Sequence, residues 1–207
     1  NHASIVTGAR ASGATIAPFK HNDMGHLEKL IRFHIANGQP RTHRKWKKIL
    51  IIFEGIYSME GEMCPLPDLI RLKKKYNLYL YMDEAHSIGA TGPTGRGVAE
   101  YYGVGTKDID IMMGTFTKSF GSVGGYVAAD QHIINYLRTS AFGSCYATGM
   151  PPAAAQIAES ALKVIMGEDG TNIGKEKIAQ LRKNEELLRV GLQNQGFEVI
   201  GDPHSPV

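Results

Sequence analysis

The chain has few cysteines and no long apolar run. Its 207 residues include only Cys64 and Cys145, too few for the disulfide framework of a small secreted domain, so we expect two reduced thiols. No apolar stretch approaches the roughly 18 residues that a membrane-spanning helix requires, and no signal-peptide pattern opens the sequence. A disulfide-stapled domain and a bundle of membrane helices are therefore excluded for these residues.

The chain also carries little net charge. The net charge of +3 gives no support to nucleic-acid binding, which needs a strongly basic face. The phosphate loop G-x-x-x-x-G-K-[ST] is absent, so residues 83–86 (DEAH) do not indicate a helicase-type NTPase. The spacing of His21, His26, His34 and His43 fits no zinc pattern, and we expect no metal.

Positive charge is concentrated in one segment, residues 39–48 (QPRTHRKWKK). Runs of charge between regular elements are usually solvated. We therefore interpret this segment as a solvated loop, with a binding patch as the alternative.

Short apolar runs alternate with helical patterns along the chain. Apolar positions three and four residues apart predict helices, and apolar runs too short for a helix predict buried strands. This alternation is typical of an α/β domain with one mostly parallel sheet flanked by helices. Helices are expected over 26–37, 67–76, 131–138, 152–167 and 175–193, and strands over 49–53, 78–82, 109–113 and 124–129, with a further apparent strand just before residue 205.

The two ends of the sequence look like cuts through a larger protein. The first residue is Asn1 rather than methionine, and the chain stops at Val207 just after the apparent last strand. We expect any targeting or membrane segment to lie outside these residues.

Polar residues follow three of the predicted strands. Ser58 comes after the first, Asp83 and His86 after the second, and Thr115, Thr117 and Lys118 after the third. Ligands usually bind at the carboxyl ends of such strands. A lysine, a carboxylate, a histidine and hydroxyls suit pyridoxal 5'-phosphate (PLP), which needs an amine, a partner for its ring nitrogen and ligands for its phosphate. An isolated lysine is usually solvated and an isolated aspartate usually caps a helix, so the combination carries the prediction.

Several motifs, taken in order, resemble those of the α-oxoamine synthase family. They are residues 1–4 (NHAS), 21–23 (HND), 54–59 (EGIYSM), 83–87 (DEAHS) and 114–121 (GTFTKSFG). The resemblance implies the aspartate-aminotransferase-like PLP fold and the decarboxylative joining of an amino acid to an acyl-CoA. It also implies that residues 1–207 are part of the PLP-binding large domain, with the small C-terminal domain starting at about residue 175. The glycine-rich phosphate cradle and the carboxylate-binding arginine are expected outside the chain.

Within this family, residues 39–42 (QPRT), 92–97 (GPTGRG) and 115–121 (TFTKSFG) are most similar to the lysine-bearing subunit of the eukaryotic serine palmitoyltransferases. That likeness implies condensation of L-serine with palmitoyl-CoA to 3-oxosphinganine, the first step of sphingolipid synthesis. Residues 146–152 (YATGMPP) instead have the shorter spacing of the bacterial siblings. The alternative is therefore a sibling enzyme that uses glycine or alanine with another acyl-CoA.

The resemblance also assigns roles by position. Lys118 resembles the lysine that carries PLP as a Schiff base and moves the α-proton. Asp83 resembles the partner of the pyridine nitrogen, because an opposite charge favours the protonated ring. His86 and Ser58 resemble the donors to the phenolic oxygen. His2 resembles the histidine that stacks on the ring and orients the substrate carboxylate, with a capping or core role as its alternative.

Three threonines resemble phosphate ligands. Thr115 and Thr117 would act within the subunit, and Thr148 would reach the phosphate of a neighbouring subunit. The implied assembly is a homodimer, or a heterodimer with a homologous subunit that lacks the lysine. A non-enzymatic subunit of the same fold is a rival interpretation, and Lys118 in its motif argues against it. The implied location is the cytosolic face of the endoplasmic reticulum membrane, with membrane association only through segments outside this chain.

Overall fold

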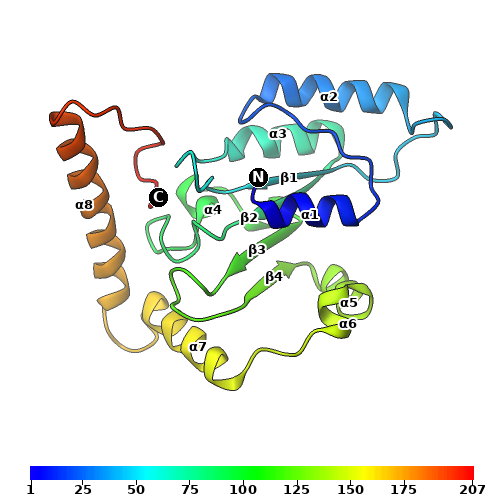
Figure 1. The fold of residues 1–207 in the computed structure, drawn as a ribbon. Helices are drawn as coiled ribbons and strands as arrows, with labels where there is room; N and C mark the ends of the chain where they lie inside the picture. The colour runs from blue at the N-terminus through cyan, green and yellow to red at the C-terminus, as the bar shows by residue number, and fades with distance from the viewer.

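A computed structural model describes residues 1–207 and contains one four-stranded sheet (Figure 1). Its strands are β1 (Leu50–Glu54), β2 (Tyr79–Asp83), β3 (Ile111–Thr115) and β4 (Gly125–Ala129), in the order β1-β2-β3-β4. β1 pairs with β2 and β2 with β3 in parallel, whereas β4 runs antiparallel to β3. The predicted α/β fold with a mostly parallel sheet flanked by helices is confirmed.

The helices include all those expected from the apolar spacing. The helices around residues 3–11, 98–101 and 142–146 were not predicted, and the last two, of four and five residues, are too short to show a helical period. In chain order the helices are α1 (Ala3–Ala11), α2 (Met24–Asn37), α3 (Leu66–Tyr76), α4 (Val98–Tyr101), the 3₁₀ turn η1 (Thr106–Asp108), α5 (Gln131–Ser140), α6 (Phe142–Tyr146), α7 (Pro152–Met166) and α8 (Ile173–Asn194).

Local signals set where the helices begin and end. The Asp23 carboxylate accepts the backbone N–H of His26 at 2.8 Å and caps α2, which ends at Gly38 in a conformation with φ of 67°. α3 has a proline in its first turn and ends at Asn77 in the left-handed region.

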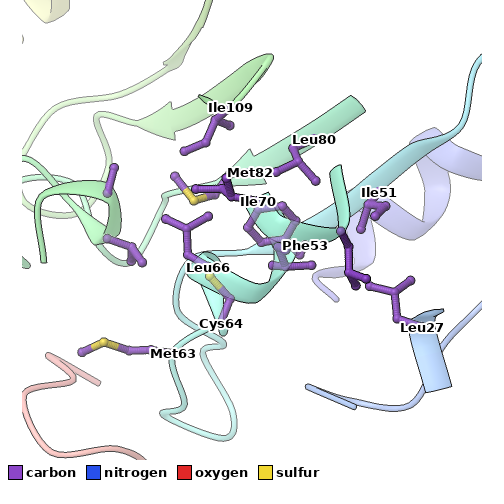
Figure 2. Packing of buried hydrophobic residues seen from close by; sticks show 14 of the residues in the cluster. Leu27, Ile51, Phe53, Met63, Cys64, Leu66, Ile70, Leu80, Met82 and Ile109 are labelled. Atoms are coloured by element: carbon purple, nitrogen blue, oxygen red, sulfur yellow. The ribbon is translucent and has the colours of Figure 1, made fainter. Parts of the chain in front are cut away.

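The core lies between β1, β2 and the helices α2 and α3. α3 packs on β2 and α2 packs on α3. Leu66, Leu72, Leu80 and Met82 are fully buried there, each contributing about 2 kcal/mol of hydrophobic stabilisation. Figure 2 shows Phe53 of β1 among these side chains, with Ile109 closing the side next to β3.

The remaining helices extend the fold beyond this core. In Figure 1, α5 and α6 lie at one end of β4, α7 lies on the side of the sheet away from α2, and α8 runs along the left edge of the molecule. α5 packs against β4, and α7 against α8. None of the helices combines the length and the hydropathy needed to cross a bilayer.

Two expectations about strands need correction. The apparent strand just before residue 205 does not form, and residues 197–200 adopt no regular structure. A strand requires a neighbouring backbone to pair with, and neither edge of the sheet, β1 or β4, pairs with this segment. β1, β2 and β3 end one or two residues later than their apolar runs, so Glu54, Asp83 and Thr115 are strand residues, whereas β4 ends at Ala129 as predicted.

Candidate active site

The carboxyl ends of the three parallel strands meet at one edge of the sheet. Glu54 and Asp83 end β1 and β2 and are paired in register, and Asp83 pairs in turn with Met113 of β3. A cavity of about 900 Å³ opens at this edge. Its polar and charged lining side chains are His2, Ser4, Glu54, Asp83, His86, Thr115, Thr117, Lys118, Tyr126, Arg138 and Ser144.

Six of the eight site residues predicted from the sequence line this cavity: His2, Asp83, His86, Thr115, Thr117 and Lys118. Ser58 and Thr148 do not line it. Ser58 is half-buried in the turn after β1, and Thr148 is exposed in the segment between α6 and α7. The chemical roles of all eight residues stay predictions.

His2 and Glu54 join the start of the chain to the end of β1. The backbone N–H of His2 donates to Glu54 Oε1 at 2.5 Å, and His2 Nδ1 accepts the backbone N–H of Ser4 at 3.2 Å to cap α1. Figure 1 accordingly places the start of α1 beside the end of β1. Glu54 is 5% exposed, and burial raises its pKa although the bond from His2 opposes this.

Asp83 presents a buried carboxylate to the cavity. It is 5% exposed, and its Oδ1 accepts the backbone N–H of Ala85 at 2.8 Å. Oδ2 makes no hydrogen bond within the chain, so one oxygen is free to accept from a ligand. His86 lies three residues further on, in the turn after β2. Burial lowers the pKa of this half-buried imidazole, the positive charge of Lys118 lowers it further, and Asp83 opposes both. His86 is therefore a neutral imidazole at pH 7.

The turn after β3 carries the amine and the hydroxyls. Thr115 Oγ1 lies 2.8 Å from Thr117 Oγ1, accepts the Thr117 backbone N–H at 3.2 Å and donates to the Gly124 carbonyl at 3.0 Å. These bonds fix the turn that holds Lys118. The Lys118 ammonium is exposed and has no ion-pair or hydrogen-bond partner in the chain.

Backbone spacing at this end of β3 and β4 leaves room only for glycine. Gly114 pairs with Tyr126, whose ring occupies the place of a side chain at position 114. A side chain at Gly125 would meet the carbonyl of Gly114 at 2.7 Å. Burial raises the pKa of the Tyr126 hydroxyl to about 12, with the carboxyl of Glu84 adding to the shift, so this cavity-lining phenol stays protonated.

Sequence reasoning missed three of the charged or phenolic lining residues. Glu54 follows an apolar run in the same way as Asp83, so the pattern that singled out one carboxylate could have found the other. Arg138 and Tyr126 gave no such signal. Arg138 lies in an ordinary amphipathic helix, and Tyr126 enters the cavity only because β4 turns back beside β3.

Comparisons with known proteins agree with this geometry. The sequence profile of the family described as "Aminotransferase class I and II" matches residues 1–206. "Long chain base biosynthesis protein 2b" of Oryza sativa subsp. japonica is 62% identical over 207 residues, which are all of this chain and 42% of that protein. "Serine palmitoyltransferase 2" of Dictyostelium discoideum is 55% identical over 207 residues, again 42% of its length. The chain thus spans less than half the length of the curated relatives it matches.

Solved structures of similar fold agree with the sequence comparisons. A Sphingomonas wittichii serine palmitoyltransferase superposes with a TM-score of 0.84 at 31% identity, covering 99% of this chain and 47% of that one. A serine palmitoyltransferase described with a PLP internal aldimine gives 0.80 at 33% identity over 96% of this chain and 46% of that one. The 8-amino-7-oxononanoate synthase of Francisella tularensis gives 0.77 at 26% identity over 99% of this chain and 54% of that one. By its sequence, its fold and the composition of its strand-end cavity, this chain belongs to the class I and II aminotransferase family.

Proposed function

We propose that the protein carrying this chain is a PLP-dependent acyltransferase that condenses L-serine with palmitoyl-CoA and releases carbon dioxide, coenzyme A and 3-oxosphinganine. The observation that carries the proposal is the meeting of Lys118, Asp83, His86 and His2 in one cavity at the carboxyl ends of parallel strands. Relatives of 55–62% identity that are named for serine palmitoyltransferase or long-chain-base synthesis support the choice of substrates.

The residues present fit PLP. The unpaired ammonium of Lys118 would bind its aldehyde carbon, and the free Oδ2 of Asp83 would accept from the ring nitrogen. His86 would hydrogen-bond the phenolic oxygen, and Ser58, the second donor that the resemblance implies, does not line the cavity. The Thr115 and Thr117 hydroxyls would bind the phosphate. When bound, PLP supplies an electron sink for negative charge at the α-carbon of the amino acid.

The chain's own residues would then handle protons and orientation. Lys118 Nζ would take the α-proton of the amino acid and return a proton to the product. His2 would hold the substrate against the ring, and its position is fixed because Glu54 binds its backbone N–H. The neutral imidazole of His86 can donate one hydrogen bond without adding positive charge beside Lys118.

Covalent mapping tests the central assignment. The full-length protein should be yellow, and borohydride reduction should bleach it and leave a pyridoxyl group on Lys118. An adduct on another lysine would overturn the assignment. Formation of 3-oxosphinganine from serine and palmitoyl-CoA, followed by mass spectrometry, tests the reaction separately.

A sibling reaction with glycine or alanine is the second candidate. The shorter spacing of residues 146–152 favours it, and the superposition on an 8-amino-7-oxononanoate synthase is compatible with it. Exchange of the α-proton with solvent, measured for serine, glycine and alanine in the presence of an acyl-CoA, separates the candidates. Rapid exchange for glycine or alanine with none for serine would move the protein to the sibling class.

The assembly and location that we propose follow the resemblance to the α-oxoamine synthase family. Two subunits, identical or with a homologous partner lacking the lysine, would complete each site. Thr148 is exposed and outside its own cavity, which suits a contact to a neighbouring subunit's phosphate. The segment from about residue 175, within α8, would begin the small domain, and the enzyme would work at the cytosolic face of the endoplasmic reticulum membrane. A mass measurement on the purified full-length protein tests the assembly, since a monomer with full activity would contradict it.

A further inference from the structure

Residues 39–48, which we call the basic loop, lie far from the cavity in the fold. The loop leads into the amino end of β1, whereas the cavity lies at the carboxyl ends of the strands. In Figure 1 it projects at the edge of the molecule, beyond the end of α2. Neither the strand-end cavity nor a second cavity, beside Ile88 and Phe120, has a lining residue from this loop. The proposed reaction therefore leaves the loop without a role.

The loop carries more positive charge than the whole chain does. It contains Arg41, Arg44, Lys45, Lys47 and Lys48 and no acidic residue, so the rest of the chain sums to −2. All five side chains are exposed, and none forms an ion pair. Charged side chains that fold without carboxylate partners remain available to an external anion.

The loop is held in one shape. The backbone N–H of Gln39 donates to the Arg44 carbonyl at 2.8 Å, and that of His43 donates to the Gln39 carbonyl at 2.9 Å. A side chain at Gly38, whose φ is 67°, would meet the carbonyl of His43 at 2.5 Å, so only glycine permits this closure. Trp46 Nε1 donates to the His34 carbonyl of α2 at 3.0 Å. A preformed surface loses little conformational entropy on binding.

Exposed apolar side chains lie beside these cations. Phe33, near the end of α2, is 59% exposed, and its ring packs edge-on against His34. His34 packs in the same way against Trp46 of the loop, so the aromatic side chains and the cations form one continuous surface.

We propose that the basic loop, with Phe33, is a docking surface for an anionic lipid bilayer. Lipid headgroups supply the negative charge, and the adjacent acyl region receives the aromatic side chain, a combination used by interfacial membrane-binding segments. A double-stranded nucleic acid would match the charge, but its bases are stacked inside the duplex and offer no apolar layer to Phe33. This contact is additional to membrane association through other segments and does not depend on the proposed reaction.

Vesicle binding tests the proposal. The purified protein is titrated with vesicles of phosphatidylcholine alone, or of phosphatidylcholine with phosphatidylserine, and binding is read by co-sedimentation. Trp46 is the only tryptophan of residues 1–207. With any tryptophan elsewhere in the full-length protein replaced by phenylalanine, quenching of its fluorescence by brominated lipid reports contact at the loop itself. We expect tighter binding to the anionic vesicles and quenching of Trp46 by these vesicles only, and both should weaken as salt rises because screening shortens the reach of the charges.

Matched triple variants locate the contact. Arg44→Gln with Lys45→Gln and Lys47→Gln should weaken binding roughly 100-fold, about fivefold for each cation removed. The control replaces three exposed lysines elsewhere, Lys107, Lys177 and Lys183, by glutamine and makes the same change in net charge. It should bind as the unaltered protein does.

Phe33→Ala should weaken binding with no change in charge. Circular dichroism confirms that each variant is folded. Equal binding to neutral vesicles, equal weakening by the two triple variants, or binding of RNA by the loop in place of vesicles would each overturn the proposal.

Discussion

Glu84→Gln should stabilise the protein above pH 7, because Glu84 is a buried carboxyl with an unsatisfied oxygen. The residue follows Asp83 but does not line the cavity, and it is 1% exposed. Its Oε1 accepts the Val98 backbone N–H at 2.8 Å and the Ser87 hydroxyl at 3.3 Å, whereas Oε2 has no partner. No cation pairs with it, and an ionised carboxylate is costly to bury in such a place.

The magnitude follows from the pKa. Burial raises the pKa of Glu84 from 4.5 to about 7, the negative charge of Asp83 adds to this, and the bonds from Val98 and Ser87 oppose it. Between these values the folded state keeps a proton that the unfolded chain has released, so stability falls as the pH rises. The loss is complete above pH 7 and amounts to about 3 kcal/mol, at about 1.4 kcal/mol for each pKa unit. Glutamine cannot ionise, and its oxygen can still accept from Val98.

Denaturant unfolding at several pH values measures the effect. The stability gained by Glu84→Gln should be larger at pH 8 than at pH 5 by roughly 2 kcal/mol. Glu100→Gln is the matched control. Its carboxylate accepts the Thr94 N–H and hydroxyl and the Arg96 N–H. Burial raises the pKa of Glu100, but these bonds outweigh burial and leave its pKa lowered.

The control should respond in the opposite sense. Because the folded-state pKa of Glu100 is depressed, its contribution to stability is present at neutral pH and is lost as the pH falls. Glu100→Gln should therefore destabilise the protein more at pH 7 than at pH 4. If Glu84→Gln gained no more stability at pH 8 than at pH 5, the raised pKa of Glu84 in the folded protein would be refuted.

Four further changes have defined outcomes. Lys118→Ala should abolish product formation and the borohydride-sensitive yellow colour. Asp83→Asn should leave PLP bound but slow α-proton exchange by roughly 100-fold or more, measured by loss of deuterium from labelled serine. Exchange at the normal rate would contradict the role of Asp83 as partner of the ring nitrogen. Gly97→Ala should cost about 3 kcal/mol in denaturant unfolding, because Gly97 has a φ of 83° and its Cβ would overlap the Glu84 carboxyl. Leu80→Ala, at a fully buried position, should lower the free energy of unfolding by about 3 kcal/mol and leave its pH dependence unchanged. A loss below 1 kcal/mol would contradict the burial of Leu80 in the core.

The sequence alone was sufficient to predict the α/β fold and most of the residues assigned to the site. Apolar runs around residues 51, 80 and 111 mark the three parallel strands because strands covered on both faces need continuous hydrophobicity. Polar residues that follow such runs must gather at one edge, since parallel strands all end on the same side. Five of the eight predicted site residues, all at or just after the ends of β2 and β3, met in the cavity for this reason, and His2 reaches it from the start of the chain.

The pairing partners were decided by the tertiary structure. The run at residues 124–129 predicts a strand, but only its packing beside β3 makes it antiparallel and turns Tyr126 toward the site. An apolar pattern does not encode the direction of its neighbour, because side-chain burial is the same for either direction. For the same reason the apparent strand before residue 205 could look like a strand and yet find no neighbour to pair with.

Contacts between residues far apart in the sequence, and the pairing of charged side chains, could be seen only in the folded structure. Glu54 holds His2 at the cavity only because the amino end of the chain folds back to the end of β1. The hydrogen bond from the His2 N–H to Glu54 joins residues 52 positions apart. The basic loop was recognised in the sequence as a run of charge, but its lack of ion pairs and its place beside Phe33 emerged only from the packing of α2. A sequence pattern fixes which side chains are apolar or charged along the chain. Which of them face one another depends on the free energy of the whole packed structure.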